Sequence, residues 1–194
     1  DNEAVNLFCS NNFWGRTLAA SSTSNDPLCY NHTGPFMRGF EVIPFNCIKS
    51  LENAFKVNPN IVSFMLEPIQ GEAGIIIPDD GYLTKVKELC KQYNVLMIAD
   101  EVQTGLGRTG KLLACDYEEV RPDILILGKA LSGGMMPISA VLADTDVMEV
   151  MTPGTHGSTF GGSPLAAAVG MEAIRIIEDE NLIENSYEMG GLFR

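Results

Sequence analysis

The sequence has few of the residues that metal centres and disulfide frameworks require. It contains two histidines and five cysteines, and the cysteines are scattered without a C-x-x-C pair: Cys9, Cys29, Cys47, Cys90 and Cys115. A zinc site is therefore not expected, and no metal is predicted. The odd, scattered cysteines instead predict reduced thiols in an intracellular protein, in the mitochondrial matrix or the cytoplasm.

Basic residues are also scarce, and long apolar runs are missing. The 194 residues include 13 lysines and arginines against 25 aspartates and glutamates, which gives a net charge of −12. This balance argues against nucleic acid or an acidic membrane surface as a partner. No apolar run approaches the ~20 residues of a membrane-spanning helix, so no membrane partner is expected.

What the sequence does contain is a succession of strand and helix patterns without a repeat or a linker. Hydrophobic residues make up 45% of the chain, which is enough for one sizeable core. We expect strands at Ala4–Ser10, Phe40–Pro44, Ile61–Leu66, Val95–Asp100, Ile124–Leu127 and Ile138–Ala143. Helices are expected at Leu18–Ser22, Ile48–Lys56, Tyr82–Tyr93, Leu112–Glu119, 144–151 and Leu165–Glu178, and from Leu182 onward. This order predicts one α/β domain with a mostly parallel sheet.

Two of these strands end on residues of opposite charge. The run Val95–Ala99 is followed by Asp100, and the run Ile124–Leu127 is followed by Gly128 and Lys129. Because ligands of open α/β sheets bind outside the carboxyl ends of the strands, we expect the acid and the amine at one edge. A pyridoxal phosphate (PLP) enzyme needs this pair, a lysine for the cofactor's aldehyde and an acid for its pyridinium nitrogen.

Other interpretations of the same stretch are a structural cap and a nucleotide site. Asp100 and Glu101 could cap a helix or bind Mg²⁺ in a nucleotide enzyme, but no G-x-x-x-x-G-K-[ST] loop occurs in the chain. The segment Gly105–Gly110 has the spacing G-x-G-x-x-G, but it leads into no convincing βαβ helix. We therefore reject a dinucleotide site. Glu101 and Arg108 are expected to form structural ion pairs, and Trp14 to serve packing.

Several of these segments together resemble the class III, fold type I PLP-dependent aminotransferases. The matching segments are N-F-W-G-R-T (12–17), G-P-F-M (34–37), E-P-I-Q-G-E-A-G (67–74), A-D-E-V-Q-T-G-L-G-R-T-G (99–110), L-G-K-A-L-S-G-G (127–134) and H-G-S-T-F-G-G-S-P-L-A (156–166). They cover nearly the whole chain in the family's order. The resemblance implies a three-layer fold in which helices flank a mostly parallel sheet, and PLP as cofactor.

The resemblance also implies roles at the cofactor. Lys129 looks like the Schiff-base lysine, which also moves a proton during the reaction. Asp100 looks like the partner of the pyridine nitrogen, and Gln103 like the donor to the cofactor's phenolic oxygen. Phe13 would stack on the ring.

Further roles concern the substrate and a second subunit. Arg16 would hold a substrate carboxylate, and Glu72 looks like the glutamate that masks a second arginine in one half-reaction. Glu67 is expected to support this cofactor and substrate environment. Thr159, with Ser158, would reach the phosphate of the neighbouring subunit's cofactor, which implies a homodimer with shared active sites.

The implied reaction is transfer of the δ-amino group of L-ornithine to 2-oxoglutarate, giving glutamate 5-semialdehyde and glutamate. N-F-W-G-R-T in place of the F-H-G-R-T of acetylornithine enzymes favours ornithine as donor. Alternatives are another class III ω-aminotransferase that uses acetylornithine or 4-aminobutyrate, and a non-catalytic binding or scaffold protein.

The resemblance covers only part of a family chain. Residues 1–194 are expected to form most of the large cofactor-binding domain, with an N-terminal segment and a C-terminal small domain lying outside it. We therefore expect an aminotransferase whose 1–194 segment is not active by itself.

Overall fold

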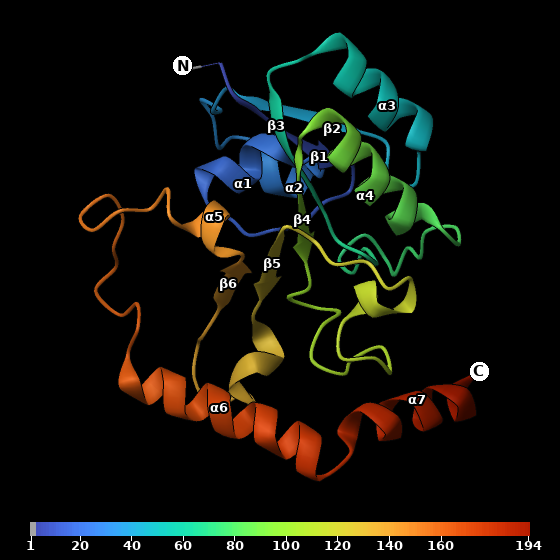
Figure 1. Cartoon of the computed structure of the whole chain (residues 1–194), viewed down its shortest axis with the longest axis vertical. Helices are drawn as coiled ribbons and strands as arrows, with labels where there is room; N and C mark the ends of the chain where they lie inside the picture. Colours follow the sequence, from blue (N-terminus) through green and yellow to red (C-terminus); the bar gives the residue numbers. More distant parts are fainter. Residues whose placement is uncertain (1–2) are drawn as a thin grey trace.

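A six-stranded sheet forms the centre of the molecule in the computed structural model, which describes residues 3–194 (Figure 1). The strands are β1 (Val5–Cys9), β2 (Phe40–Ile43), β3 (Ile61–Leu66), β4 (Leu96–Asp100), β5 (Ile124–Leu127) and β6 (Ala140–Ala143), in the spatial order β2-β1-β3-β4-β5-β6. All neighbours pair in parallel except β5 and β6, which are antiparallel. The predicted mostly parallel α/β fold is confirmed.

One face of the sheet carries the main hydrophobic core. Helices α3 (Ile48–Val57) and α4 (Tyr82–Tyr93) pack against it, side by side (Figure 1). The buried side chains of α4 recur with helical spacing, and they meet strand residues that share one face of the sheet. These core residues are Leu7, Leu51, Phe55, Phe64, Leu83, Val86, Cys90 and Met97.

The opposite face is covered at the β1–β2 end by helix α1 (Leu18–Thr23) and an aromatic cluster. The Trp14 indole stacks on Phe8 with ring centroids 5.1 Å apart, and Phe40 meets Phe8 edge-on at 5.7 Å. Trp14 Nε1 donates a hydrogen bond of 2.7 Å to Thr23 Oγ1. The expectation that Trp14 serves packing is confirmed.

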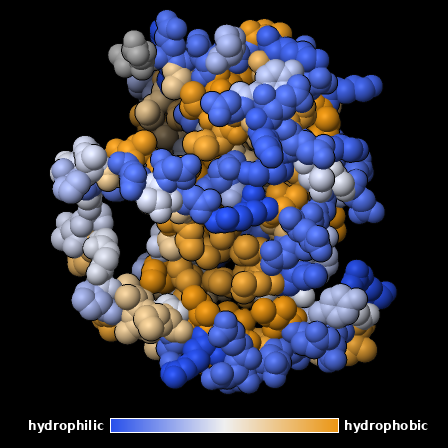
Figure 2. All heavy atoms as spheres, in the orientation of Figure 1, coloured by the Kyte–Doolittle hydropathy of each residue, from blue (hydrophilic) through white to orange (hydrophobic). Residues whose placement is uncertain are grey.

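Helix α6 (Pro164–Asp179) lies beyond the carboxyl end of β5 and contacts the short 3₁₀ helix η2 (Lys129–Ser132) that follows this strand (Figure 1). Helix α7 (Leu182–Phe193) continues from α6 and packs against the loop that follows β4. The one-turn helix α5 (Thr145–Met148) precedes a loop that projects from the body of the molecule. An apolar area remains exposed above α6 (Figure 2). None of the helices within residues 3–194 is long and apolar enough to cross a membrane.

Two predicted segments differ from the structure. The helix expected at Leu112–Glu119 is wrong, because only the 3₁₀ helix η1 (Ala114–Tyr117) forms there. The stretch between α1 and β2, for which the sequence predicted no helix or strand, contains a one-turn helix, α2 (Pro27–Tyr30), whose first turn is capped by the Asp26 carboxylate. Asp followed by Pro is a helix-start signal that the sequence contained.

Candidate active site

Four parallel strands end at the same edge of the sheet, and each leads into a segment with predicted site residues. β1 leads to Phe13 and Arg16, and β3 leads to the loop 67–74. β4 ends on Asp100, and β5 is followed by Gly128 and Lys129. The sheet topology therefore brings together segments that are far apart in the sequence.

Asp100 and Lys129 lie at the carboxyl ends of the neighbouring strands β4 and β5, the positions that the sequence predicts. Asp100 is only 7% exposed, and one carboxylate oxygen accepts a 3.0 Å hydrogen bond from the amide of Val102. Burial raises the pKa of Asp100, whereas the Val102 amide and the positive charge of Lys129 act in the opposite direction. No salt bridge joins Asp100 to Lys129 within residues 3–194, so the lysine's charge acts on the carboxylate from beyond contact distance.

The backbone at Lys129 has an uncommon conformation. Its φ is +40°, which is rare for a residue with a side chain and typical of positions held in place by their surroundings. A Cβ on the preceding Gly128 would lie 3.3 Å from a methyl group of Val102, so glycine allows the β5 end to approach the β4 loop closely. The sequence predicted the lysine, but not this left-handed turn.

Glu67 connects the β1 and β3 loops. Glu67 is only 8% exposed, and its two carboxylate oxygens accept hydrogen bonds from the amides of Phe13, at 3.1 Å, and Gly71, at 3.0 Å. Burial raises the pKa of Glu67, the two amides lower it, and the negative charges of Asp100 and Glu72 raise it further. Glu67 therefore supports the site through the backbone on both sides.

Gln103 and Glu72 form a pair across the edge. Gln103 Nε2 donates a 3.0 Å hydrogen bond to Glu72 Oε1. A Cβ on Gly71 would lie 2.5 Å from the Gln103 side-chain oxygen, so the absence of a side chain at position 71 makes room for this glutamine. Gln103, to which the resemblance assigns a hydrogen bond with the cofactor's phenolic oxygen, therefore donates to Glu72 in this structure.

Arg16 lies at the outer side of the site. Its guanidinium carbon is 5.5 Å from the centre of the Phe13 ring, and Nη1 is 3.9 Å from Cys29 Sγ. The side chain is exposed, and within residues 3–194 it forms no salt bridge with a carboxylate. An exposed planar cation without an acidic partner is suited to a carboxylate ligand.

A cavity of about 1200 Å³ opens beside Lys129. Its wall includes Gly71 and Gln103 from one side and residues of α6 and α7, such as Ile176 and Met189, from the other. The cavity is somewhat larger than the roughly 300–1,000 Å³ of a typical small-molecule site, and it has the mostly apolar lining with a few polar groups that such sites show.

Ser158 and Thr159 do not join this cluster. Both are exposed in the loop between α5 and α6, which projects away from the sheet (Figure 1). Ser158 Oγ accepts a 2.8 Å hydrogen bond from Gly161 in the same loop. Within the chain, therefore, the structure gathers the other seven predicted site residues and leaves these two apart.

The segment Gly105–Gly110 serves close packing against α7. A Cβ on Gly110 would lie 2.9 Å from the Tyr187 Cβ, and Ser186 Oγ donates a 3.0 Å hydrogen bond to the carbonyl of Arg108. The glycine spacing therefore accommodates a helix and not a dinucleotide phosphate, in agreement with its rejection above.

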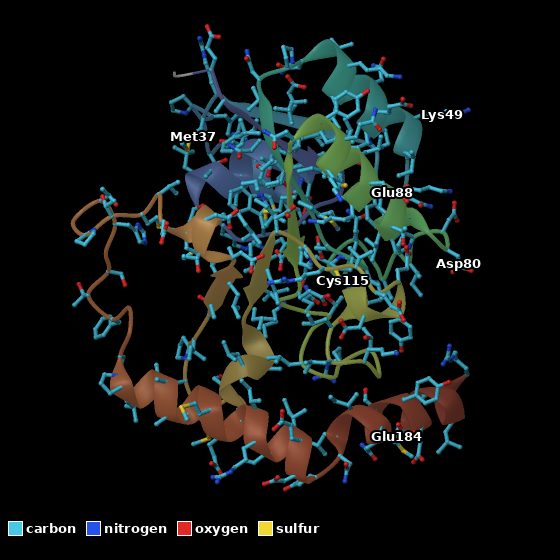
Figure 3. All side chains as sticks on the ribbon, viewed as in Figure 1. Met37, Lys49, Asp80, Glu88, Cys115 and Glu184 are labelled. Atoms are coloured by element: carbon cyan, nitrogen blue, oxygen red, sulfur yellow. The ribbon has the colours of Figure 1, made fainter. Side chains whose placement is uncertain are left out.

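Glu101 is an organising residue whose role the sequence did not reveal. It is 1% exposed, and its carboxylate accepts hydrogen bonds from the amides of Ala114, at 3.0 Å, and Cys115, at 2.9 Å, and from the Thr104 hydroxyl. It belongs to none of the salt bridges within residues 3–194, nor does Arg108, so the predicted ion pairs are wrong. Cys115 is buried in the interior (Figure 3).

Replacing Glu101 with alanine should destabilise the protein by about 3 kcal/mol, because two buried amides would lose their acceptor. The free energy of unfolding in denaturant measures this effect. Glu88→Ala is the matched control, since Glu88 projects to solvent from α4 (Figure 3) and its loss should change stability by less than about 0.5 kcal/mol. Equal stability of the two variants would contradict this role for Glu101.

The residues at this edge fit the ring and aldehyde of PLP. Asp100 is a buried acid with a single hydrogen-bond donor among residues 3–194, Val102, so its carboxylate can accept another from a pyridinium N–H. Lys129 lines the adjoining cavity, where its amine can meet an aldehyde. An acid and a lysine at the ends of adjacent strands are the feature that best fits PLP.

A model of the aminotransferase class-III family matches residues 2–194. The chain belongs to the class-III aminotransferase family. This places the Asp100–Lys129 pair, the loop 67–74 and the cavity in an aminotransferase scaffold.

Named relatives and solved structures agree with this assignment. The chain is 61% identical to the mitochondrial ornithine aminotransferase of Drosophila melanogaster and 57% identical to that of Rattus norvegicus, covering 100% and 97% of this chain but 44% and 43% of those proteins. The crystal structure of the ornithine aminotransferase from Toxoplasma gondii superposes with a TM-score of 0.98 at 53% identity, over 100% of this chain and 46% of that one. The chain spans about half the length of the curated relatives it matches.

One solved relative has a different named substrate. The acetylornithine aminotransferase of Elizabethkingia anophelis superposes with a TM-score of 0.84 at 49% identity, over 100% of this chain and 44% of that one. The fold is thus shared between enzymes named for ornithine and for acetylornithine.

Proposed function

We propose that the protein containing this chain is an ornithine aminotransferase, which transfers the δ-amino group of L-ornithine to 2-oxoglutarate. The observation that carries this proposal is the placement of Asp100 and Lys129 at the carboxyl ends of the adjacent strands β4 and β5, in a chain 61% identical to an enzyme of that name. Residues 1–194 would form most of its large cofactor-binding domain.

PLP is the proposed cofactor. A structure of the Toxoplasma gondii enzyme, 53% identical to this chain, is described as having partial occupancy of PLP at its active site. Bound PLP supplies an electron sink that stabilises the negative charge left when a proton is removed next to the amino group. Asp100 would accept a hydrogen bond from the ring N–H and hold the proton there, and Phe13 would stack on the ring.

Lys129 is the proposed catalytic base and acid. Its amine would first bind the cofactor's aldehyde and then, once the substrate has taken its place, carry a proton between two carbon atoms. Lys129 follows the end of β5 with a left-handed backbone and lines the cavity. Gln103 would donate to the cofactor's phenolic oxygen when its present partner, Glu72, turns to another group.

Substrate selection would depend on Arg16 and Glu72. Arg16 can hold a carboxylate with two parallel hydrogen bonds, which both 2-oxoglutarate and an amino acid offer. Glu72 would neutralise a second arginine during the ornithine half-reaction, and Glu67 would keep both loops in place. Ser158 and Thr159, in the projecting loop, would reach the phosphate site of a second subunit in a homodimer.

Relatives with named compartments support a location. The Drosophila melanogaster and Rattus norvegicus relatives are named mitochondrial. This favours the mitochondrial matrix over the cytoplasm for the present protein.

The test is an assay of the full-length protein with PLP, 2-oxoglutarate and one amino donor at a time. We expect glutamate 5-semialdehyde from ornithine and little product from acetylornithine or 4-aminobutyrate. Faster turnover of acetylornithine than of ornithine would favour an acetylornithine aminotransferase, the alternative that the Elizabethkingia anophelis structure supports. Absence of any turnover, together with no visible absorbance from bound PLP, would instead favour a non-catalytic role.

A further inference from the structure

Gln70 is a buried polar residue near the site that has no role in the proposed reaction. It is 0% exposed, and its side-chain Nε2 donates a 2.7 Å hydrogen bond to the carbonyl of Ser10. Its side-chain oxygen Oε1 is buried and has no hydrogen-bond partner among residues 3–194. Burying an unpaired oxygen opposes folding, so stability alone gives no reason for an amide at this position.

The backbone of Gln70 is fixed as firmly as its side chain. Its N–H donates to the carbonyl of Ile76 at 3.0 Å, and its own carbonyl accepts from the Ile76 amide at 2.9 Å. This two-residue bridge closes the loop that contains Gly71 and Glu72. The Gln70 side chain therefore projects from a rigid base.

Ser10, the partner of Gln70, lies where β1 gives way to the segment that carries Phe13 and Arg16. The Ser10 amide donates to the Ile43 carbonyl at 2.7 Å, so only its carbonyl is directed toward the β3 loop. The Gln70 amide is the donor that holds this carbonyl.

A second connection runs parallel to the first. Glu67 joins the amides of Phe13 and Gly71, so the segments 10–13 and 67–71 are tied both at Ser10 and at Phe13. Two ties at different points fix both the distance and the relative angle of two loops, whereas one tie would leave them free to rotate. Arg16 lies three residues beyond the first segment, and Glu72 directly follows the second.

We propose that Gln70 is a positioning residue that sets the separation between the loop of Arg16 and the loop of Glu72, and thereby the fit of the dicarboxylate and amino-acid substrates. This inference rests on the proposed function, which assigns both loops to substrate binding. Gln70 forms no hydrogen bond with Arg16 or Glu72 within residues 3–194, and it acts through the Ser10 carbonyl and through its backbone bridge to Ile76, which closes the loop of Glu72.

The test uses the full-length holoenzyme with Gln70→Met, which keeps the side-chain length and removes both polar atoms. Ser63→Ala is the matched control, because Ser63 is buried and its hydroxyl donates a 2.6 Å hydrogen bond to Asn6, also between β1 and β3 but away from the site. We expect Gln70→Met to raise the KM values for 2-oxoglutarate and ornithine roughly tenfold with kcat nearly unchanged. The control should leave both KM values as they are.

Amide hydrogen exchange on the cofactor-free proteins gives a readout that does not depend on activity. Residues 10–17 should exchange faster in Gln70→Met than in wild type or Ser63→Ala, while α4 exchanges alike in all three. The inference would be overturned if Gln70→Met left exchange at residues 10–17 unchanged. It would also be overturned if the wild type is active and Gln70→Met has the same KM values as the wild type. An inactive wild type would refute the proposed function, and the exchange experiment would then decide the role of Gln70 by itself.

Discussion

Replacing Lys129 with alanine should abolish transamination, with a loss of about 10⁴-fold in kcat. Two properties are removed together, the amine that binds the cofactor's aldehyde and the group that moves the proton. The exposed position of Lys129 in the cavity wall means that the fold should survive the change. The measurements are steady-state kcat with ornithine and the visible absorbance of bound PLP.

Lys49→Ala provides the control for this experiment. Lys49 is an exposed lysine on α3 (Figure 3) that does not line the cavity beside Lys129, and its loss should leave kcat unchanged. A small primary amine added to the Lys129→Ala protein should restore part of the activity, because it supplies the missing base in solution. Activity of Lys129→Ala close to that of wild type would refute the assignment of the catalytic lysine.

Asp100→Asn should have the second-largest effect, a loss on the order of 10²–10³-fold in kcat. The amide keeps the shape of the side chain and an oxygen that can accept from the Val102 amide. It lacks the negative charge that would hold a proton on the ring nitrogen, so the electron sink would be weakened. Steady-state kcat of the holoenzyme measures this loss, and activity within a factor of a few of wild type would exclude the proposed pairing.

The same substitution should raise the stability of the cofactor-free protein at neutral pH. Burial raises the pKa of Asp100, so the folded state holds a proton in a pH range where the unfolded chain has lost it. The contribution of Asp100 to the free energy of unfolding therefore falls as pH rises through this range. Asparagine carries no such charge, and the advantage of Asp100→Asn should shrink as pH is lowered toward the ordinary range of a carboxyl group.

Denaturant unfolding of the two cofactor-free proteins at several pH values measures this advantage. A variant less stable than wild type at neutral pH would show that the Asp100 charge is well solvated or paired within the chain. Loss of activity combined with a gain in stability is the expected signature of a charge kept for function.

The regular elements were predicted most accurately where an apolar pattern alone determined them. β3 at Ile61–Leu66, α4 at Tyr82–Tyr93 and β5 at Ile124–Leu127 have the predicted bounds. Each is a strongly patterned run whose buried side faces the main core. Local preference and tertiary packing agree in these segments, so the sequence was sufficient.

The segment after Asp100 shows where local pattern failed. Its apolar residues favoured a helix at 112–119, but the Glu101 carboxylate takes the amides of Ala114 and Cys115. The two amides therefore donate to Glu101, thirteen and fourteen positions earlier, and only the 3₁₀ turn η1 forms in this segment. A buried acceptor supplied by another part of the chain is not visible in the periodicity of the segment itself.

The sequence by itself determined the α/β class, the acid and lysine at two strand ends and the family resemblance, because each depends on residue type and local order. Only the tertiary structure decided that Glu67 and Gln70 tie two loops together and that Gln103 binds Glu72. It also decided that Lys129 adopts a left-handed backbone. These features depend on distances between segments that parallel strands bring to one edge, and no local pattern encodes such distances.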